Sequence, residues 1–467
     1  MINEETGEKI KIIKREKETI ANPKNGKTVK LEIISFGFLA ALAFFLPIFV
    51  LPFAASSIAS SKAILLYYGV LLSAFFWLLV MLQSGQIKIP KSSLLAALAA
   101  IVLVWLFASL FSSNASISLI GKVYDIDTFS IIAFVALLLF LTSVLFQSEK
   151  RVFTFYFLIF VSSLFLFLFQ FLHIVFKIDI IPVKIFQSMI SNPLGSWNDF
   201  AVFFGFIGIV SLAFFEFFKL EKWMKLVLFI LLVFSMFSMA AVNFLAAWVI
   251  FGFFALVLFV FLLYRLFSLS QSENKTDPKK FFVLSLFVFI ISTFFIYDHI
   301  RAKNNNESGI GGKISVALNV TTLTVRPTWS TTWSVVKQAI KSDPILGSGP
   351  NTFLYDWFKF KPAEVNKTIF WNMGFSSGIG YLPSALATTG LLGGLALIGF
   401  LFFFLSYGAR IISGGQRNLS GSLVLVSFLG AAYLWAFNIF YAPGLAILAL
   451  AFMMTGITLA TMVRSGK

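Results

Sequence analysis

Apolar segments of about twenty residues alternate with short polar connections along almost the whole chain. A helical segment of this length crosses a hydrocarbon core of roughly 30 Å. The period-2 alternation typical of membrane barrel strands is absent, so the pattern predicts an all-α bundle. Twelve transmembrane helices are expected, at 33–55, 62–84, 93–111, 128–147, 152–176, 199–218, 223–241, 243–267, 281–298, 380–407, 419–440 and 443–463.

Polar stretches divide the chain into four parts. They are a basic tail (1–31), nine helices (32–298), a long loop (299–380) and three further helices (381–467). The tail is polar and rich in lysine, which predicts a flexible segment in the cytoplasm. Only Val242 and Asn243 separate the seventh and eighth helices, so this connection is expected to be very tight, with room for a turn inside the membrane.

Composition supports the membrane class. Of the 467 residues, 59% are hydrophobic and 12% are charged, whereas a soluble chain has about 25% charged residues. The net charge of +16 would suit nucleic acid, but the distribution of the basic residues indicates another cause. The predicted inner segments hold 23 of the 36 basic residues, and the short outer connections hold Lys62, Lys122, Lys177 and Lys184. The positive-inside rule therefore predicts that both termini are cytoplasmic, with no nucleic-acid partner.

Few side chains suit metal or ion chemistry. The chain has no cysteine and two histidines, and its carboxylates are not clustered at metal-ligand spacing. We therefore expect no metal, no other cofactor and no disulfide. Ionisable residues are scarce within the predicted helices, which disfavours an ion-coupled transporter. A lipid or glycan flippase does not need such residues and stays an alternative.

The loop 299–380 is the only long polar connection, and such a segment is usually functional or disordered. Its beginning, 301–312, is expected to be mobile. Trp329, Trp333, Val336 and Ile340 then recur at helical spacing after Pro327, which predicts an amphipathic helix of about 15 residues at the outer membrane interface. Such a helix could be purely structural or could shape a substrate site.

A glycine-rich run follows this helix, with Gly347 and Gly349 as its closely spaced glycines. Their backbone N–H groups could face an anion, or the run could be a simple tight turn. The long loop holds nine basic residues against four acidic ones. This excess predicts an anionic ligand such as a lipid phosphate, although a general affinity for anionic headgroups would produce the same excess. Aromatic residues of the loop could stack on sugars or form a membrane belt.

Four stretches of the chain carry motifs of one known family: 89–121, 192–201, 326–353 and 381–393. The third contains Arg326-x-x-Trp329 and an Asp-Pro-Ile-Leu-Gly-x-Gly-Pro-Asn run that begins at Asp343, and the fourth begins with Tyr381. In this combination the chain resembles the O-antigen ligase and O-antigen polymerase family. The likeness extends over most of the chain.

The resemblance implies a bacterial membrane glycosyltransferase of about a dozen spans that acts at the outer face of the cytoplasmic membrane. Its donor would be a glycan linked to undecaprenyl diphosphate, and its acceptor a lipid, a growing glycan or a protein. Arg326 matches the family arginine that holds the diphosphate. Two positions depart from the family pattern, because Leu245 and Gly378 stand where ligases have a second arginine and a histidine. The ligase catalytic set is therefore not carried over, and a catalytically inactive scaffold of this family is a further alternative.

Candidate site residues follow from the loop and from the resemblance. The catalytic candidates are Arg326, His299 and Glu364, and Asp356 and His173 are further candidates for activating an acceptor. The substrate-binding candidates are Arg301, Lys337, Lys341, Gly347, Gly349, Asn351, Asn198 and Tyr381.

Overall fold

The computed structural model describes residues 26–51, 57–86, 89–122, 124–178, 192–270, 283–320, 322, 325–413 and 419–464. Eleven helices in these ranges are long and apolar enough to cross a membrane. They are α2 (Gly26–Ile48), α3 (Ile58–Ser84), α4 (Ser93–Leu110), α7 (Glu149–Phe176), α8 (Trp197–Phe217), α9 (Lys222–Val242), α10 (Leu245–Ser270), α11 (Val283–Asn305), α15 (Tyr381–Ser413), α16 (Leu419–Phe440) and α17 (Leu445–Arg464).

A twelfth apolar helix, α6 (Phe129–Leu145), has 17 residues, a length of about 25 Å. The protein is therefore an all-α multi-pass membrane protein, as the sequence predicted, and the count of twelve spans depends on this shorter helix. Short helices complete the described chain: α5 (Ala115–Leu119), α12 (Ile310–Ala317), α13 (Trp329–Ser342), α14 (Phe353–Phe360) and the 3-10 helix η3 (Ala363–Lys367).

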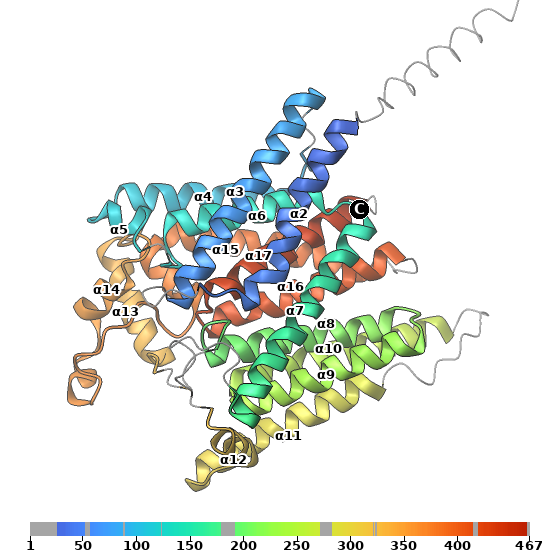
Figure 1. Ribbon diagram of the computed structural model, residues 1–467. Coiled ribbons are helices and arrows are strands. Elements are labelled where there is room, and N and C mark those ends of the chain that lie inside the picture. The colour runs from blue at the N-terminus through green and yellow to red at the C-terminus, as the bar shows by residue number, and fades with distance from the viewer. Residues whose placement is uncertain are drawn as a thin grey trace, which may run out of the picture.

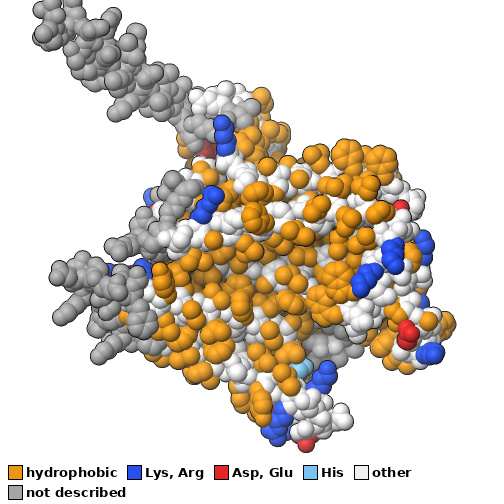
Figure 2. All heavy atoms as spheres, turned by 180° about the vertical axis from the view of Figure 1, so that it is seen from behind, with side chains coloured by type: hydrophobic (Ala, Val, Ile, Leu, Met, Phe, Trp, Pro, Cys, Tyr) orange, Lys and Arg blue, Asp and Glu red, His pale blue; other side chains and the backbone are white. Residues whose placement is uncertain are grey.

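The helices pack around three enclosed members, α8, α16 and α17. Helix α8 packs against α9 and α16, and α17 packs against α6 and α16. The pairs α2–α3, α4–α15 and α10–α11 surround this centre (Figure 1). We call the end of the bundle that carries α5, α13 and α14 the loop end. A coat of hydrophobic side chains covers most of the face in Figure 2, as expected for a surface in contact with lipid.

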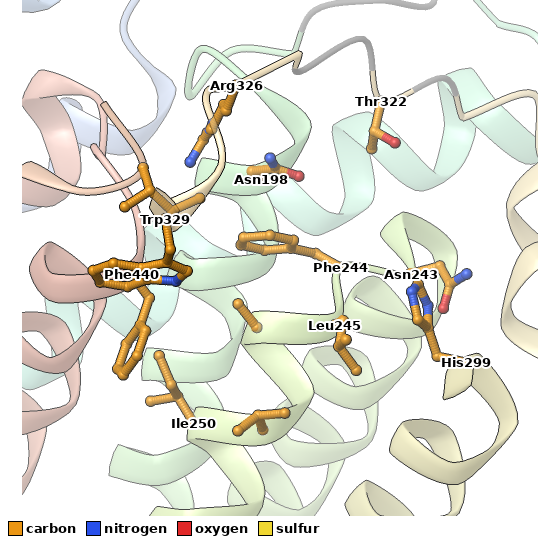
Figure 3. Close-up of a pocket in the computed structure, with 13 residues that line it drawn as sticks. Asn198, Asn243, Phe244, Leu245, Ile250, His299, Thr322, Arg326, Trp329 and Phe440 are labelled. Atoms are coloured by element: carbon orange, nitrogen blue, oxygen red, sulfur yellow. The ribbon is translucent and has the colours of Figure 1, made fainter. Parts of the chain in front are cut away.

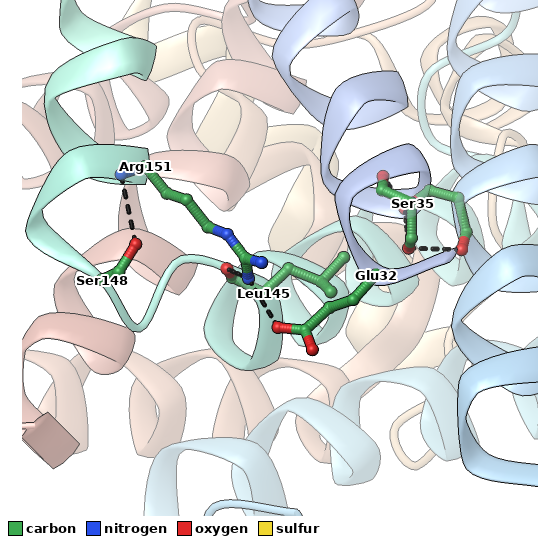
Figure 4. A network of polar contacts seen from close by, with 6 residues as sticks. Glu32, Ser35, Leu145, Ser148 and Arg151 are labelled. Carbon is green, nitrogen blue, oxygen red and sulfur yellow. Dashed lines mark hydrogen bonds and ion pairs between the residues drawn. The ribbon is translucent and has the colours of Figure 1, made fainter. Parts of the chain in front are cut away.

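A charged contact joins two helices away from the loop end. Arg151, in the first turn of α7, forms an ion pair with Glu32 of α2 at 2.9 Å. The same Arg151 nitrogen, Nη1, donates to the carbonyl of Leu145 at 2.7 Å, and Ser148 caps the helix by accepting from the Arg151 backbone N–H (Figure 4). Because both charges are largely enclosed, the pair and its extra acceptor hold α2 against the α6–α7 turn.

Among the predicted boundaries that differ from the structure, two change the extent of the polar segments. Helix α2 begins at Gly26, so the last residues of the predicted tail are helical. Helix α11 continues to Asn305, and α12 follows at Ile310, so the prediction of a mobile segment at 301–312 was wrong. The Asp298 carboxylate accepts from the Gly311 N–H at 3.0 Å and thereby holds α12 against the end of α11. Hydrophobic periodicity could not predict this contact, because it depends on a polar side chain, that of Asp298.

The long loop is anchored inside a broken helix. Gly390 interrupts α15 with a φ of 63°, and residues 344–350, which we call the inserted turn, enter the break. Three backbone hydrogen bonds join them: Leu391 N to Pro344 O at 2.9 Å, Leu392 N to Ile345 O at 3.2 Å and Gly349 N to Thr388 O at 2.8 Å. A helix break leaves backbone groups unsatisfied, and the inserted turn supplies their partners.

The predicted amphipathic helix is confirmed as α13, with Thr328 as its N-cap. Its buried face, however, consists of Thr332, Val335, Val336 and Ala339. Trp329 and Trp333 are about two-fifths exposed. The helix therefore packs on α15 through small and β-branched residues. Trp333 is partly exposed, and the Trp329 ring packs edge-on against Phe440 of α16, with 6.0 Å between ring centres.

Candidate functional site

A cavity of about 550 Å³ opens at the loop end, and we call it the pocket. Its polar lining comes from five side chains on separate parts of the chain: Asn198, Asn243, His299, Thr322 and Arg326. Figure 3 shows Arg326 and Asn198 near one another, with His299 beside Asn243 across the pocket. Three residues that the sequence singled out, Arg326, His299 and Asn198, therefore line one cavity.

Local structure explains how each polar side chain reaches the pocket. Asn198 lies in the first turn of α8, after its N-cap Ser196. Asn243 ends α9 with a left-handed φ of 54°, a conformation that asparagine tolerates better than most residues. His299 lies on the part of α11 that extends beyond its predicted end. Arg326 comes two residues before the N-cap of α13.

The rest of the pocket is apolar. Phe244, Leu245, Val249 and Ile250 line it from the start of α10, and Phe440 lines it from the end of α16. Positions 244 to 250 extend about 9 Å along the chain axis at the rise of an α-helix. The pocket thus combines a polar end that carries a cation with an apolar wall directed along a membrane-spanning helix. This arrangement can accommodate an amphiphile with an anionic headgroup.

The Arg326 guanidinium is held by an aromatic ring. Its Cζ atom lies 3.7 Å from the centre of the Tyr441 ring. Burial lowers the pKa of Arg326 below its ordinary value, and the nearby Tyr441 and Asp199 oppose this shift. The guanidinium remains charged at any physiological pH. Among the described residues it forms no hydrogen bond or ion pair, so its N–H donors are available to a ligand.

The inserted turn contains two of the predicted binding residues, Gly347 and Gly349, but the structure gives their N–H groups internal partners. The Gly347 N–H donates to Asp343 O at 3.1 Å, and the Gly349 N–H donates within the break of α15. A Cβ atom on Gly347 would lie 2.6 Å from Gly390 N, so this close approach requires glycine. In this conformation the two amides hold the loop in place and do not face the pocket.

Asn351 joins the inserted turn to two acids before α6. Its side chain donates to Asp125 at 3.0 Å, and its backbone N–H donates to Asp127 at 3.3 Å. Thr388 also donates to Asp127, at 3.1 Å. Burial raises the pKa of Asp127 to about 6. The described residues contain no group of three or more histidine, aspartate or glutamate side chains that could hold a metal ion.

The remaining candidates lie outside the pocket lining. Glu364, Lys337 and Lys341 are exposed on η3 and α13, and Arg301 is exposed two residues after His299 on α11. Tyr381 is buried at the start of α15, and its backbone N–H donates to Tyr441 O at 3.2 Å. Asp356 accepts from Ser348 at 2.5 Å, and burial raises its pKa to about 6. His173 is buried within α7.

Sequence reasoning missed several pocket residues. Asn243 and Phe244 form the tight connection between α9 and α10. The shortness of this connection was the only feature of the sequence that could have pointed to them. Thr322 had no signal in the sequence, and neither did Tyr441, which contacts Arg326 from outside the pocket lining. Leu245, the position at which the resemblance would place a second arginine, lines the pocket together with Arg326.

No protein-family model matches this chain, and none of the curated proteins matches it either. The fold defines a multi-pass, all-α membrane protein. The pocket adds an arginine, without a hydrogen-bond or ion-pair partner among the described residues, at the polar end of an apolar cavity.

Proposed function

We propose that this protein is a membrane glycosyltransferase that transfers or polymerises a glycan from undecaprenyl diphosphate. The observation that carries the proposal is the Arg326 guanidinium, charged and unpaired among the described residues, at the polar end of the pocket. The motifs around Arg326 resemble those of the O-antigen ligase and polymerase family, which independently suggests a lipid diphosphate. The loop end would face the outside of a bacterial cytoplasmic membrane, because the basic residues concentrate on the opposite side.

Each pocket feature has a role in this reaction. Arg326 would bind the diphosphate and stabilise the negative charge that develops on it as the glycosidic bond breaks. The apolar wall along α10 would take the first part of the polyprenyl chain. His299 would accept the proton of the acceptor hydroxyl while that oxygen attacks the anomeric carbon, and undecaprenyl diphosphate would leave with the bonding electrons. The pocket leaves the identity of the acceptor open between lipid, glycan and protein.

The test is a comparison of Arg326 variants in a strain that lacks the wild-type protein. Arg326→Ala should lose essentially all transfer, and Arg326→Lys should lose most of it, because an ammonium cannot replace the planar fork of donors. Lipid extracts should then contain accumulated undecaprenyl-diphosphate-linked glycan. Arg410→Ala, an exposed arginine at the end of α15 far from the loop end, is the matched control and should transfer normally. Near-normal transfer by Arg326→Ala at equal expression would refute the proposal.

A further inference from the structure

Tyr441 lies directly behind Arg326 and is almost completely buried, with 2% of its surface exposed. It is the first residue after α16, and its backbone is fixed on both sides. Its N–H donates to Phe437 O at 2.8 Å, and its carbonyl accepts from Tyr381 N at 3.2 Å. The ring also packs edge-on against Phe244 of the pocket wall, with 5.6 Å between ring centres.

The phenol end of Tyr441 is anchored to α8. Its O–H donates to Asp199 Oδ1 at 3.0 Å and lies 3.0 Å from Ser196 Oγ. The Asp199 carboxylate has two further donors, Ser196 Oγ at 2.8 Å and Gly444 N at 2.9 Å. Packing around it is close, since a Cβ on Gly444 would lie 2.7 Å from Asp199 Oδ2. The ring therefore has a fixed position and orientation beneath the guanidinium.

This arrangement determines which part of Arg326 is used. A contact over an aromatic ring engages the face of a guanidinium and leaves the N–H donors at its edge. A direct carboxylate partner would instead occupy two of those donors. Asp199 is close enough to act on Arg326 electrostatically, but its oxygens accept from Tyr441, Ser196 and Gly444. Asp199 thus compensates part of the arginine charge without taking its donors.

We infer that Tyr441, held by Asp199 and Ser196, is a positioning residue that orients Arg326 so that its donor edge meets the anionic headgroup of the donor lipid. The inference rests on the proposed role of Arg326 in binding that headgroup. It predicts that the electron density of the ring at position 441 affects lipid affinity through Arg326.

The experiment varies the charge distribution of the ring with little change in its size. Phenylalanine and its 3,4,5-trifluoro analogue are incorporated at position 441 in the full-length protein, and the Kd for undecaprenyl diphosphate is measured in nanodiscs. Fluorination removes the negative charge from the ring face, so the trifluoro variant should bind about ten-fold more weakly than Tyr441→Phe. Both variants should show the same midpoint of thermal unfolding. In an Arg326→Ala background the two rings should give equal affinity.

The outcomes separate the inference from the proposed function. Equal affinity of the phenylalanine and trifluoro variants in the presence of Arg326 would overturn the inference. If Arg326→Ala still weakened lipid binding in that case, the proposed function would stand. Unchanged binding in Arg326→Ala would refute both. A fluorination effect that persists without Arg326 would show that Tyr441 acts directly on the lipid or on the fold, and would also overturn the inference.

Discussion

Two buried acids, Asp127 before α6 and Asp356 in the long loop, form hydrogen bonds outside the pocket lining and leave the pocket to a cation. Asp127 accepts from Asn351 and Thr388, and Asp356 accepts from Ser348. Both carboxyls are enclosed, and burial raises each pKa to about 6. Among the described residues that line the pocket, His299 is the side chain that can accept or donate a proton near neutral pH.

Replacing Asp356 with asparagine should change how stability depends on pH. The pKa of Asp356 is raised from 3.8 to about 6, so between these values the folded protein binds the proton more tightly than the unfolded chain. Stability is therefore lost as pH rises from about 4 to about 6. Asp356→Asn, which is always neutral, should unfold at a higher temperature than the wild type at pH 7 and at a similar temperature at pH 4. Thermal unfolding of detergent-solubilised protein measures this.

Glu307 provides the control for that measurement, because its side chain is exposed. Glu307→Gln should follow the wild-type profile at both pH values. A variant Asp356→Asn that is equally destabilised at pH 4 and pH 7 would show that hydrogen bonding to Ser348, and not the charge, dominates at this position.

At the scale of elements, the break in α15 determines where the long loop lies. The inserted turn fills the break. Helix α13 precedes this turn in the chain and α14 follows it, and both pack against α15 at the loop end. Arg326 lies two residues before Thr328, the N-cap of α13, so the position of α13 on α15 also positions the guanidinium. The run around Gly347 and Gly349 thus forms a tight turn, the alternative to an anion site. It contributes to the pocket indirectly, by fixing the helix that positions Arg326.

A side chain at Gly390 should displace the inserted turn. Gly390 has a φ of 63°, and a Cβ atom would lie 2.6 Å from Gly347 N and from Ile345 O, both backbone atoms. The ψ of Gly390 is −162°, a combination confined essentially to glycine, so Gly390→Ala should destabilise the protein by about 1–3 kcal/mol before any steric clash. Thermal unfolding and faster amide exchange in residues 344–350 would report the effect.

Gly399 offers a matched substitution in the same helix. A Cβ there meets nothing within 4 Å, and alanine favours helix over glycine by about 1 kcal/mol. Gly399→Ala should therefore leave stability unchanged or slightly higher. If Gly390→Ala behaved like Gly399→Ala, the inserted turn would not depend on the glycine break.

At the scale of the whole molecule, charge and hydrophobicity divide the surface. The face in Figure 2 is covered largely by hydrophobic side chains, and its lysines and arginines gather near the ends of the bundle. The pocket opens at the loop end, where the lipid headgroups of one leaflet would lie. Access from that leaflet suits a ligand that is delivered by diffusion within the membrane.

The orientation of the bundle can be measured with introduced cysteines, because the chain has none of its own. Ser308 and Asn366 are exposed at the loop end, and Ser84 and Ser413 are exposed at the opposite ends of α3 and α15. Single cysteines at the first pair should react with an impermeant maleimide added to intact cells. Those at the second pair should react only after permeabilisation. Labelling of the second pair from outside would reverse the proposed orientation.

The sequence by itself determined the helical class, most of the spans and the position of α13, because these depend on local hydrophobic length and spacing. It also singled out Arg326, His299 and Asn198, although for different reasons. Only the tertiary structure decided that these three share one pocket, and that Gly347 and Gly349 fill a helix break. Those outcomes depend on contacts between residues far apart in the chain. Helix periodicity describes which face of a helix is buried but carries no information about what packs against it.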